Sequence, residues 1–222
     1  MMSSHPVGNE RAFDAVVVDF GGVLTNPVQE SLEAFATSLH IELQDVVRVM
    51  LPLYGGRSDD LVERFEKGTM DEADFSKELA HRFEEVCNLP VEADNLMTRI
   101  FAGMHLETSM LDALEGVRRQ GVKTALLSNS WGMSGYPRDR FEALFDVVII
   151  SGEVGLRKPE PGIFQLTVHR LEVPPTKCVF VDDHPGHLQS AEALGMATIL
   201  HVSPEQTLTR LSDLLGMDLT AR

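Results

Sequence analysis

Short apolar runs alternate with amphipathic segments through the second half of the chain. Continuous apolar runs are typical of strands buried on both faces, whereas apolar residues three and four apart predict helices. This pattern predicts strands at 123–127, 147–150, 178–181 and 197–200, and helices at 109–120, 138–144, 161–171, 188–194 and 204–215. Strands that alternate with helices in this way indicate an α/β fold whose doubly wound parallel sheet is covered on both faces.

The pattern changes between Thr25 and about His105, where only helices are predicted. Amphipathic helices are expected at 29–39, 43–53, 59–67, 71–86 and 93–101. Asp71 is a favourable N-cap, and Phe75 and Leu79 follow it at helical spacing. We therefore expect a core domain of residues 1–24 and 106–222, with a helical domain of residues 25–105 inserted after the first strand.

The first predicted strand, residues 15–18, ends on a carboxylate. Asp19 follows four apolar residues, and a buried strand has little reason to end on a charge unless that charge is paired or used. Gly21 and Gly22 allow a sharp turn and a close approach to a ligand. Open α/β sheets bind ligands at the carboxyl ends of their strands. Asp19 is thus predicted to face a ligand.

Polar residues also follow two later strands and occupy one further loop. Ser128 and Asn129 come after one strand, Asp182 and Asp183 after another, and Lys158 lies in a loop before a helix. In a doubly wound sheet these positions converge at one edge. Neighbouring carboxylates repel unless a cation neutralises them, and oxygen ligands favour Mg²⁺. Such a set suits phosphoryl transfer, which depends on positioning and charge neutralisation.

The composition of the chain restricts the classes of partner that it is expected to bind. Among its 222 residues, 34 are acidic and 19 are basic, and the resulting net charge of −15 argues against nucleic acid and anionic membranes as partners. No apolar stretch approaches the roughly 20 residues of a membrane span, and the polar first eleven residues do not resemble a secretory signal. Cys87 and Cys178 lie far apart, as expected of reduced thiols. We expect a cytoplasmic monomer or homodimer that binds a small molecule.

Four motifs, in order, give the chain a family resemblance. It resembles the haloacid dehalogenase superfamily, whose members have an aspartate nucleophile and a Rossmann-like core. The helical insertion resembles the C1-type cap of the subgroup that includes haloacid dehalogenases and the N-terminal phosphatase domain of epoxide hydrolases. The motifs are Asp19-Phe20-Gly21-Gly22-Val23-Leu24-Thr25, Leu127-Ser128-Asn129, Lys158-Pro159 and Val181-Asp182-Asp183.

The resemblance implies catalytic and substrate-binding roles. Asp19 would attack phosphorus and form an aspartyl-phosphate. Lys158 would neutralise the nucleophile and the transferring group. Ser128 and the backbone N–H of Asn129 would hold phosphate oxygens, and Gly22 would also lie against the substrate.

The resemblance also implies a Mg²⁺ site. Its direct ligands would be the Asp19 carboxylate, the Gly21 carbonyl and Asp183, with Asp182 helping directly or through water. Residue 21 departs from the family, because most phosphatases carry there a second Asp that protonates the leaving group and activates water. General acid–base catalysis is worth roughly 10²–10⁴-fold, so Gly21 favours substrates with a good leaving group.

Three functional hypotheses follow from this resemblance. The leading one is a Mg²⁺-dependent phosphatase that acts on a small phosphorylated metabolite. A metal-independent 2-haloacid dehalogenase is the first alternative, although dehalogenases typically lack the acidic pair that Asp182 and Asp183 form here. The second is a catalytically silent binding protein, which Gly21 favours and the intact motifs oppose.

Several neighbouring residues have two possible interpretations. Arg57 lies in a loop that either only connects helices or clamps a phosphate or carboxylate group of the substrate. Trp131 is expected to pack in the protein or form a pocket wall. His184 lies at the edge of the site or on the surface. His187 stands where many relatives have Asn, and it either orients Asp183 or Lys158 or faces solvent.

Overall fold

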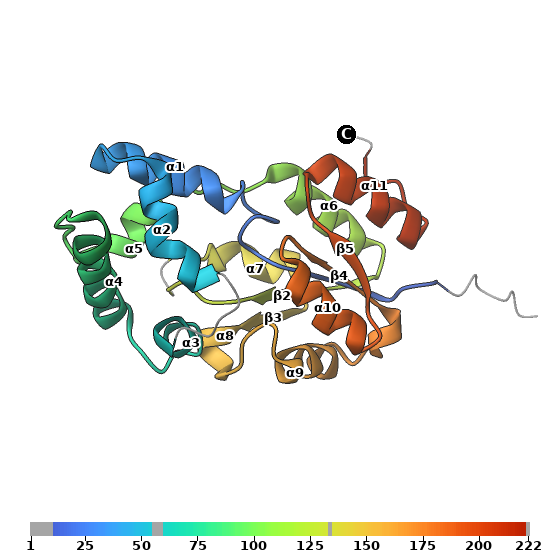
Figure 1. Cartoon of the computed structure of the whole chain (residues 1–222). Helices are drawn as coiled ribbons and strands as arrows, with labels where there is room; N and C mark the ends of the chain where they lie inside the picture. The colour runs from blue at the N-terminus through green and yellow to red at the C-terminus, as the bar shows by residue number, and fades with distance from the viewer. Residues whose placement is uncertain (1–10, 55–59, 133–134, 221–222) are drawn as a thin grey trace, which may run out of the picture.

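A five-stranded parallel sheet forms the centre of the protein (Figure 1). The computed structural model describes residues 11–54, 60–132 and 135–220. The strands lie in the order β3 (Val147–Ile150), β2 (Lys123–Ser128), β1 (Ala15–Val18), β4 (Cys178–Asp182) and β5 (Ala197–Leu200). The strand order reverses beside β1, since the chain continues to β2 on one side of it and returns to β4 on the other. Ligands of open sheets bind at such a reversal, so the residue after β1 occupies a favoured position.

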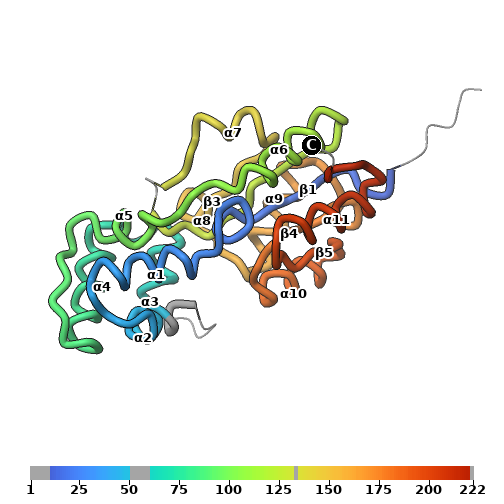
Figure 2. The backbone as a smooth tube through the Cα atoms, turned by 90° about the horizontal axis from the view of Figure 1, so that it is seen from above, coloured from blue at the N-terminus to red at the C-terminus, as the bar shows by residue number. Residues whose placement is uncertain are grey.

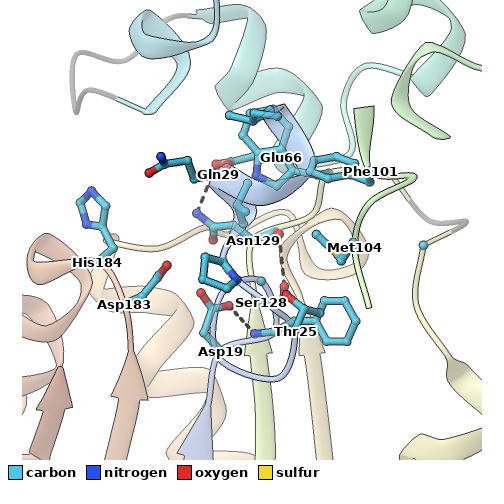
Figure 3. Close-up of a pocket in the computed structure, with 18 of the residues that line it drawn as sticks. Asp19, Thr25, Gln29, Glu66, Phe101, Met104, Ser128, Asn129, Asp183 and His184 are labelled. Carbon is cyan, nitrogen blue, oxygen red and sulfur yellow. Dashed lines mark hydrogen bonds between the residues drawn. The ribbon is translucent and has the colours of Figure 1, made fainter. Parts of the chain in front are cut away.

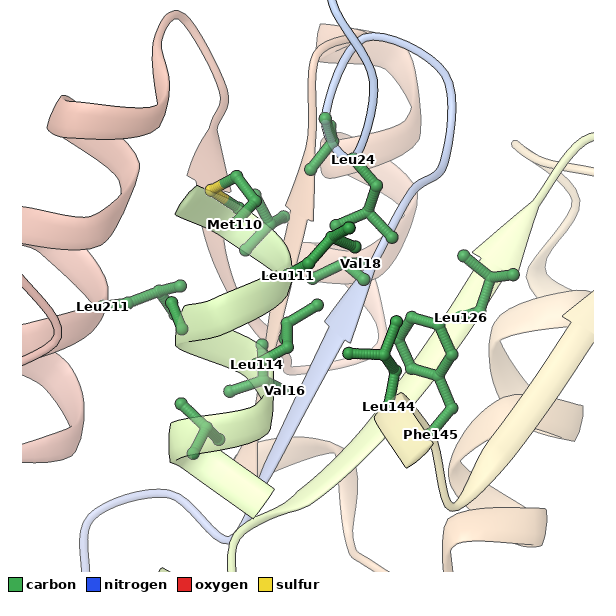
Figure 4. Packing of buried hydrophobic residues seen from close by; sticks show 14 of the residues in the cluster. Val16, Val18, Leu24, Met110, Leu111, Leu114, Leu126, Leu144, Phe145 and Leu211 are labelled. Atoms are coloured by element: carbon green, nitrogen blue, oxygen red, sulfur yellow. The ribbon is translucent and has the colours of Figure 1, made fainter. Parts of the chain in front are cut away.

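Helices cover both faces of the sheet, which confirms the predicted doubly wound α/β fold. One face carries α6 (Thr108–Arg119), α7 (Arg138–Leu144) and α11 (Pro204–Leu215), and the other carries α9 (Pro161–Leu171) and α10 (Pro185–Ala193) (Figure 1). The side chains of β1 alternate between the faces. Val16 and Val18 pack with Leu114 and Leu211 on one side (Figure 4), and Val17 packs on the other.

Two short helices lie at the connections around β3 and β4. They are α8 (Ser151–Val154), directly after β3, and the 3₁₀ helix of Pro175–Lys177, directly before β4. The sequence pattern predicts neither, because four or fewer residues are too short to show a helical period. No helix within the described ranges is long and apolar enough to cross a bilayer.

Of the described helices between β1 and β2, all except α6 form a second group beyond the carboxyl ends of the strands (Figures 1 and 2). They are α1 (Val28–Leu39), α2 (Leu43–Tyr54), α3 (Asp60–Glu66), α4 (Glu72–Cys87) and α5 (Leu96–Ile100). These helices enclose a hydrophobic cluster of their own that includes Phe35, Phe75 and Phe83. Asp71 caps α4, since its side chain accepts the backbone N–H of Asp74 at 2.8 Å.

The two segments that connect this helical group to the sheet run side by side. Thr25 and Leu106 form an antiparallel bridge. The backbone N–H of Asn26 donates to the carbonyl of His105 at 3.0 Å, and the Asn26 side chain accepts the His105 N–H at 2.8 Å. The helical group thus enters and leaves the sheet at one place. That residues 25–105 act as a separate cap domain stays a prediction.

Candidate active site

Asp19 lies in a buried ion-pair chain at the end of β1. Its Oδ1 accepts the backbone N–H of Phe20 at 2.7 Å and lies 2.8 Å from Lys158 Nζ. Lys158 is fully buried, and its Nζ also lies 2.7 Å from Asp182 Oδ2. Burying a charge is costly unless it is paired. The lysine is paired twice, so it holds the ends of β1 and β4 together.

Burial and the neighbouring charges shift the pKa values of both Asp19 and Lys158. Burial raises the pKa of Asp19 to about 8; Lys158 opposes this rise, whereas Asp182 and Asp183 add to it. Burial alone would lower the pKa of Lys158, but the Asp182 and Asp19 carboxylates raise it above its usual range. The ammonium therefore stays charged. An additional cation near Asp19 would favour its ionised form.

Asp182 is fully occupied by protein partners. Besides Lys158, it accepts the backbone N–H of His184 at 2.8 Å, and His187 Nδ1 lies 3.0 Å from each carboxylate oxygen. Burial, followed by the nearby Lys158 charge, lowers the pKa of His187 to about 4, so a neutral imidazole can donate Nδ1–H. His187 therefore contacts Asp182 and does not face solvent, and that it orients Asp183 or Lys158 stays a prediction.

The glycines after Asp19 bring Asp183 close to the loop. Gly22 has a φ of 72°, and a Cβ there would lie 2.4 Å from Asp183 Oδ2. A side chain at this position is excluded both by the left-handed backbone and by the carboxylate. The N–H of Gly22 donates to Thr25 Oγ1 at 2.9 Å, which closes the turn. Contact of Gly22 with a substrate stays a prediction.

The acidic side chains of this site fit a bound metal ion. Ligand atoms of Asp19, Asp182 and His187 lie within 4.8 Å of one another. Because Asp182 already accepts several hydrogen bonds from the protein, Asp19 and Asp183 are the carboxylates best able to bind an ion directly. With the Gly21 carbonyl they would form an oxygen-rich set, which suits Mg²⁺.

Ser128, the last residue of β2, and Asn129, which follows it, line the same cavity as Asp19 (Figure 3). Ser128 Oγ lies 2.9 Å from the hydroxyl of Tyr136, whose pKa is raised by burial, so the phenol stays protonated. The Asn129 side chain binds the backbone of Lys158, donating to its carbonyl at 3.0 Å and accepting its N–H at 2.8 Å. Of the predicted phosphate-binding residues, Asn129 is thus hydrogen-bonded to the backbone of Lys158. Their roles stay predictions.

The cavity extends from this polar end into the helical group. Its volume is about 1070 Å³. Trp131 lines it, and its ring meets the edges or faces of Phe65, Phe75 and Phe101 at centroid distances of 6.1–6.5 Å. The indole therefore packs in the helical group and also forms a pocket wall. The other apolar lining residues include Leu32, Val47, Met50, Val62, Met104 and Leu106.

Three polar residues of the site are missing from the sequence-based prediction. Glu66, at the end of α3, pairs with Arg157 at 2.7 Å, and both residues line the cavity. Tyr136 reaches Ser128 from the loop before α7. Nothing in the local pattern distinguishes these side chains from solvent-exposed ones. Arg57, predicted as a possible clamp, lies outside the described residues. His184 is half-buried at the cavity edge.

Comparison with known proteins identifies related sequences. A family model described as haloacid dehalogenase-like hydrolase matches residues 13–195. Acyl-CoA dehydrogenase family member 10 of Mus musculus is 30% identical over 233 residues, covering 97% of this chain and 21% of that protein. Bifunctional epoxide hydrolase 2 of Mus musculus is 30% identical over 138 residues, covering 58% and 25%. The chain thus spans about a quarter or less of these two relatives.

A shorter relative and a solved structure are also similar. Phosphorylated carbohydrates phosphatase of Thermotoga maritima is 31% identical over 108 residues, covering 47% of this chain and 50% of that protein. A HAD family enzyme of Bacteroides thetaiotaomicron, crystallised with magnesium and inorganic phosphate, superposes with a TM-score of 0.62 at 23% identity. The match covers 84% of this chain and 93% of the other, and it supports the same fold.

Proposed function

The chain belongs to the haloacid dehalogenase-like hydrolases, and on this premise we propose that it is a Mg²⁺-dependent phosphatase with Asp19 as nucleophile. The observation that carries the proposal is the arrangement around Lys158. One buried ammonium holds Asp19 at 2.8 Å and Asp182 at 2.7 Å, at the polar end of a large cavity. Phosphoryl transfer depends on such positioning and charge neutralisation.

In the first step, Asp19 attacks phosphorus and the bond from phosphorus to the leaving oxygen breaks. Oδ1 is held by Phe20 and Lys158, whereas Oδ2 accepts no hydrogen bond from the described residues and is the oxygen available for attack. Lys158 keeps the attacking carboxylate in place and offsets charge on the transferred group. The leaving oxygen takes its proton from water, because Gly21 has none to give.

A bound Mg²⁺ would supply further charge neutralisation, and Asp19, the Gly21 carbonyl and Asp183 would hold it. Ser128 is suited to bind a phosphate oxygen, since its hydroxyl is oriented by the Tyr136 hydroxyl at 2.9 Å. In the second step, water attacks the phosphorus of phospho-Asp19, inorganic phosphate leaves and the carboxylate is restored. With Gly21 in place of a proton carrier, this step is expected to limit turnover.

The cavity favours a substrate whose organic group is largely apolar. Its volume of about 1070 Å³ lies at the upper end of ordinary ligand sites, which run to roughly 1,000 Å³. Beyond the polar end, its walls are mostly aliphatic and aromatic side chains contributed by the helical group. Sugar hydroxyls would lose hydrogen bonds to water there with few partners to replace them. We therefore propose small phosphate esters with an apolar group rather than sugar phosphates.

A substrate panel tests this proposal. 4-Nitrophenyl phosphate, acetyl phosphate, hexyl phosphate and glucose 6-phosphate would be assayed with Mg²⁺ and with a chelator, alongside Asp19→Asn. We expect turnover that needs both Mg²⁺ and Asp19, with hexyl phosphate preferred to glucose 6-phosphate in kcat/KM. Chelator-insensitive halide release from 2-chloropropionate would instead identify a dehalogenase. Absence of both activities, with no phosphorylated Asp19, would indicate a binding protein.

A further inference from the structure

Glu66 is a buried carboxylate through which the helical group reaches the polar residues of the cavity. It is the last residue of α3 and only 3% exposed. Its Oε2 lies 2.7 Å from Arg157 Nε and accepts the side-chain N–H of Asn129 at 3.2 Å. Figure 3 shows Glu66 on the opposite side of Asn129 from Asp19. Both partners belong to the sheet side of the chain, so this carboxylate links the two groups of elements.

The contacts of Glu66 continue to the backbone of Lys158. The Asn129 side chain binds both the carbonyl and the N–H of Lys158, at 3.0 and 2.8 Å. Arg157 Nε also donates to the Lys158 carbonyl, at 3.3 Å. Glu66 therefore orients two side chains that together fix the backbone of Lys158 on both sides of its Cα. From this Cα the Lys158 side chain extends to Asp19 and Asp182.

The position of Glu66 is itself fixed by the docking of α3 on α8. The Glu66 carbonyl accepts the hydroxyl of Ser151 at 2.5 Å, and Lys67 pairs with Glu160 at 2.6 Å. Gly68 has a φ of 70°, and a Cβ there would lie 2.3 Å from the carbonyl oxygen of Gly152. The end of α3 is thus seated by contacts that do not involve the Glu66 carboxylate.

We propose that Glu66 is a positioning residue through which the helical group holds Asn129 and Lys158 in the geometry that phosphate binding needs, an inference that rests on the proposed phosphatase function. Oε2 receives two N–H groups of the protein, so Glu66 acts through its neighbours. The length of the side chain is then decisive. Gln reaches both N–H groups with its carbonyl oxygen, whereas Asp is one methylene too short to reach them from the same backbone.

The test compares Glu66→Gln with Glu66→Asp. The Gln variant keeps the reach without the charge, and the Asp variant keeps the charge without the reach. We expect kcat for 4-nitrophenyl phosphate to stay within about threefold of wild type for Gln, and to fall about 10–100-fold for Asp, as for other residues that orient site ligands. Asp74→Asn is the matched control, since Asp74 is an exposed carboxylate of the helical group paired with Lys77 at 2.8 Å. Its kcat should not change.

A binding measurement separates this proposal from the phosphatase proposal. Trp131 is the only tryptophan of the chain and follows Asn129 by two residues, so its fluorescence reports on this loop. In a titration with inorganic phosphate in the presence of Mg²⁺, the phosphate concentration at half-saturation should be at least tenfold higher for Glu66→Asp than for wild type. This expectation holds even if the wild-type protein hydrolyses no phosphate ester. Wild-type behaviour of Glu66→Asp in both assays would overturn the positioning role. A Glu66→Asp protein that is more active than Glu66→Gln would also overturn it, because charge and not reach would then be decisive.

Discussion

Gly21 and Gly22 differ in the room that each leaves for a side chain. Gly21 has no left-handed backbone, and a Cβ there would meet only Val28 Cγ2, at an ordinary 3.5 Å. We therefore expect Gly21→Asp to fold and to supply the missing proton carrier. Hydrolysis of phospho-Asp19 should then accelerate at least tenfold, within the roughly 10²–10⁴-fold range of general acid–base catalysis. Single-turnover decay of the labelled phosphoenzyme measures this step.

The neighbouring glycine provides the control for that substitution. Gly22→Ala would place a methyl group 2.4 Å from Asp183 Oδ2 on a backbone with φ of 72°, so we expect it to lower both activity and stability. A folded Gly21→Asp protein whose phosphoenzyme decays no faster would contradict the prediction. The proton carrier would then have to be sought among residues of the helical group.

The ionisation of Glu66 makes stability depend on pH. Burial raises its pKa from 4.5 to about 7, although Arg157 and Lys158 oppose the rise. The folded protein thus binds this proton more tightly than the unfolded chain, and the associated stability is present below pH 4.5 and lost as the pH rises through 7. As the pH rises from 5 to 8, the unfolding free energy of Glu66→Gln should therefore increase by about 2 kcal/mol relative to that of wild type.

Urea denaturation of both proteins at the two pH values measures this difference. Comparison with the Gln variant cancels the titration of all other carboxylates, since these are common to both proteins. An equal change in unfolding free energy for the two proteins would show that Glu66 is ionised throughout this range, held by Arg157 at 2.7 Å.

At the level of elements, a strong hydrophobic period predicts helices and strands well, whereas segments too short to show a period are not predicted. The predicted helices at 138–144, 161–171 and 204–215 coincide with α7, α9 and α11, and the strands at 147–150 and 197–200 with β3 and β5. The last helix before β5 is predicted at 188–194 but spans Pro185–Ala193. Its first turn contains Pro and Gly, which carry no apolar pattern although Pro suits the first helical position.

In the candidate site, residues marked by a local sequence pattern could be predicted, whereas residues defined by long-range contacts could not. Asp19, Ser128 and Asp182 could be predicted because each ends an apolar strand, and topology brings strand ends together. Glu66 and Tyr136 could not, because their role depends on contacts between elements far apart in sequence. Asn129 meets Glu66 across 63 residues, for example. No local period encodes such a contact.

The helical group offers a direct test of one local prediction, the N-cap of α4. Asp71 accepts the backbone N–H of Asp74 at 2.8 Å and is exposed, so its contribution is confined to the helix end. Asp71→Ala should lower the unfolding free energy by about 1 kcal/mol, whereas Asp71→Asn should retain most of the stability. Urea denaturation of the three proteins measures the effect, and equal losses in both variants would exclude capping as its cause.

At the scale of the whole molecule, negative charge is spread over the surface and is also concentrated at the ends of β1 and β4. The net charge of −15 makes any added salt reduce repulsion across the surface. The carboxylates at the ends of β1 and β4 form a local concentration, where Asp19 and Asp182 share the buried ammonium of Lys158 and Asp183 adds a third negative charge. A cation bound there would relieve this local repulsion in addition to the general one. Two effects of Mg²⁺ on stability must therefore be separated.

We expect Mg²⁺ to raise the Tm beyond the effect of NaCl at the same ionic strength. A ligand present at 100 times its Kd stabilises the folded state by about 2.7 kcal/mol, whereas screening acts alike for any salt of equal ionic strength. A chelator should reverse the increase. Asp183→Asn should abolish the specific part, because the carboxylate beside Gly22 is then lost, while the response to NaCl persists. If the Asn variant gained as much from Mg²⁺ as wild type does, the ion would be acting on the surface charge and not at the end of β1.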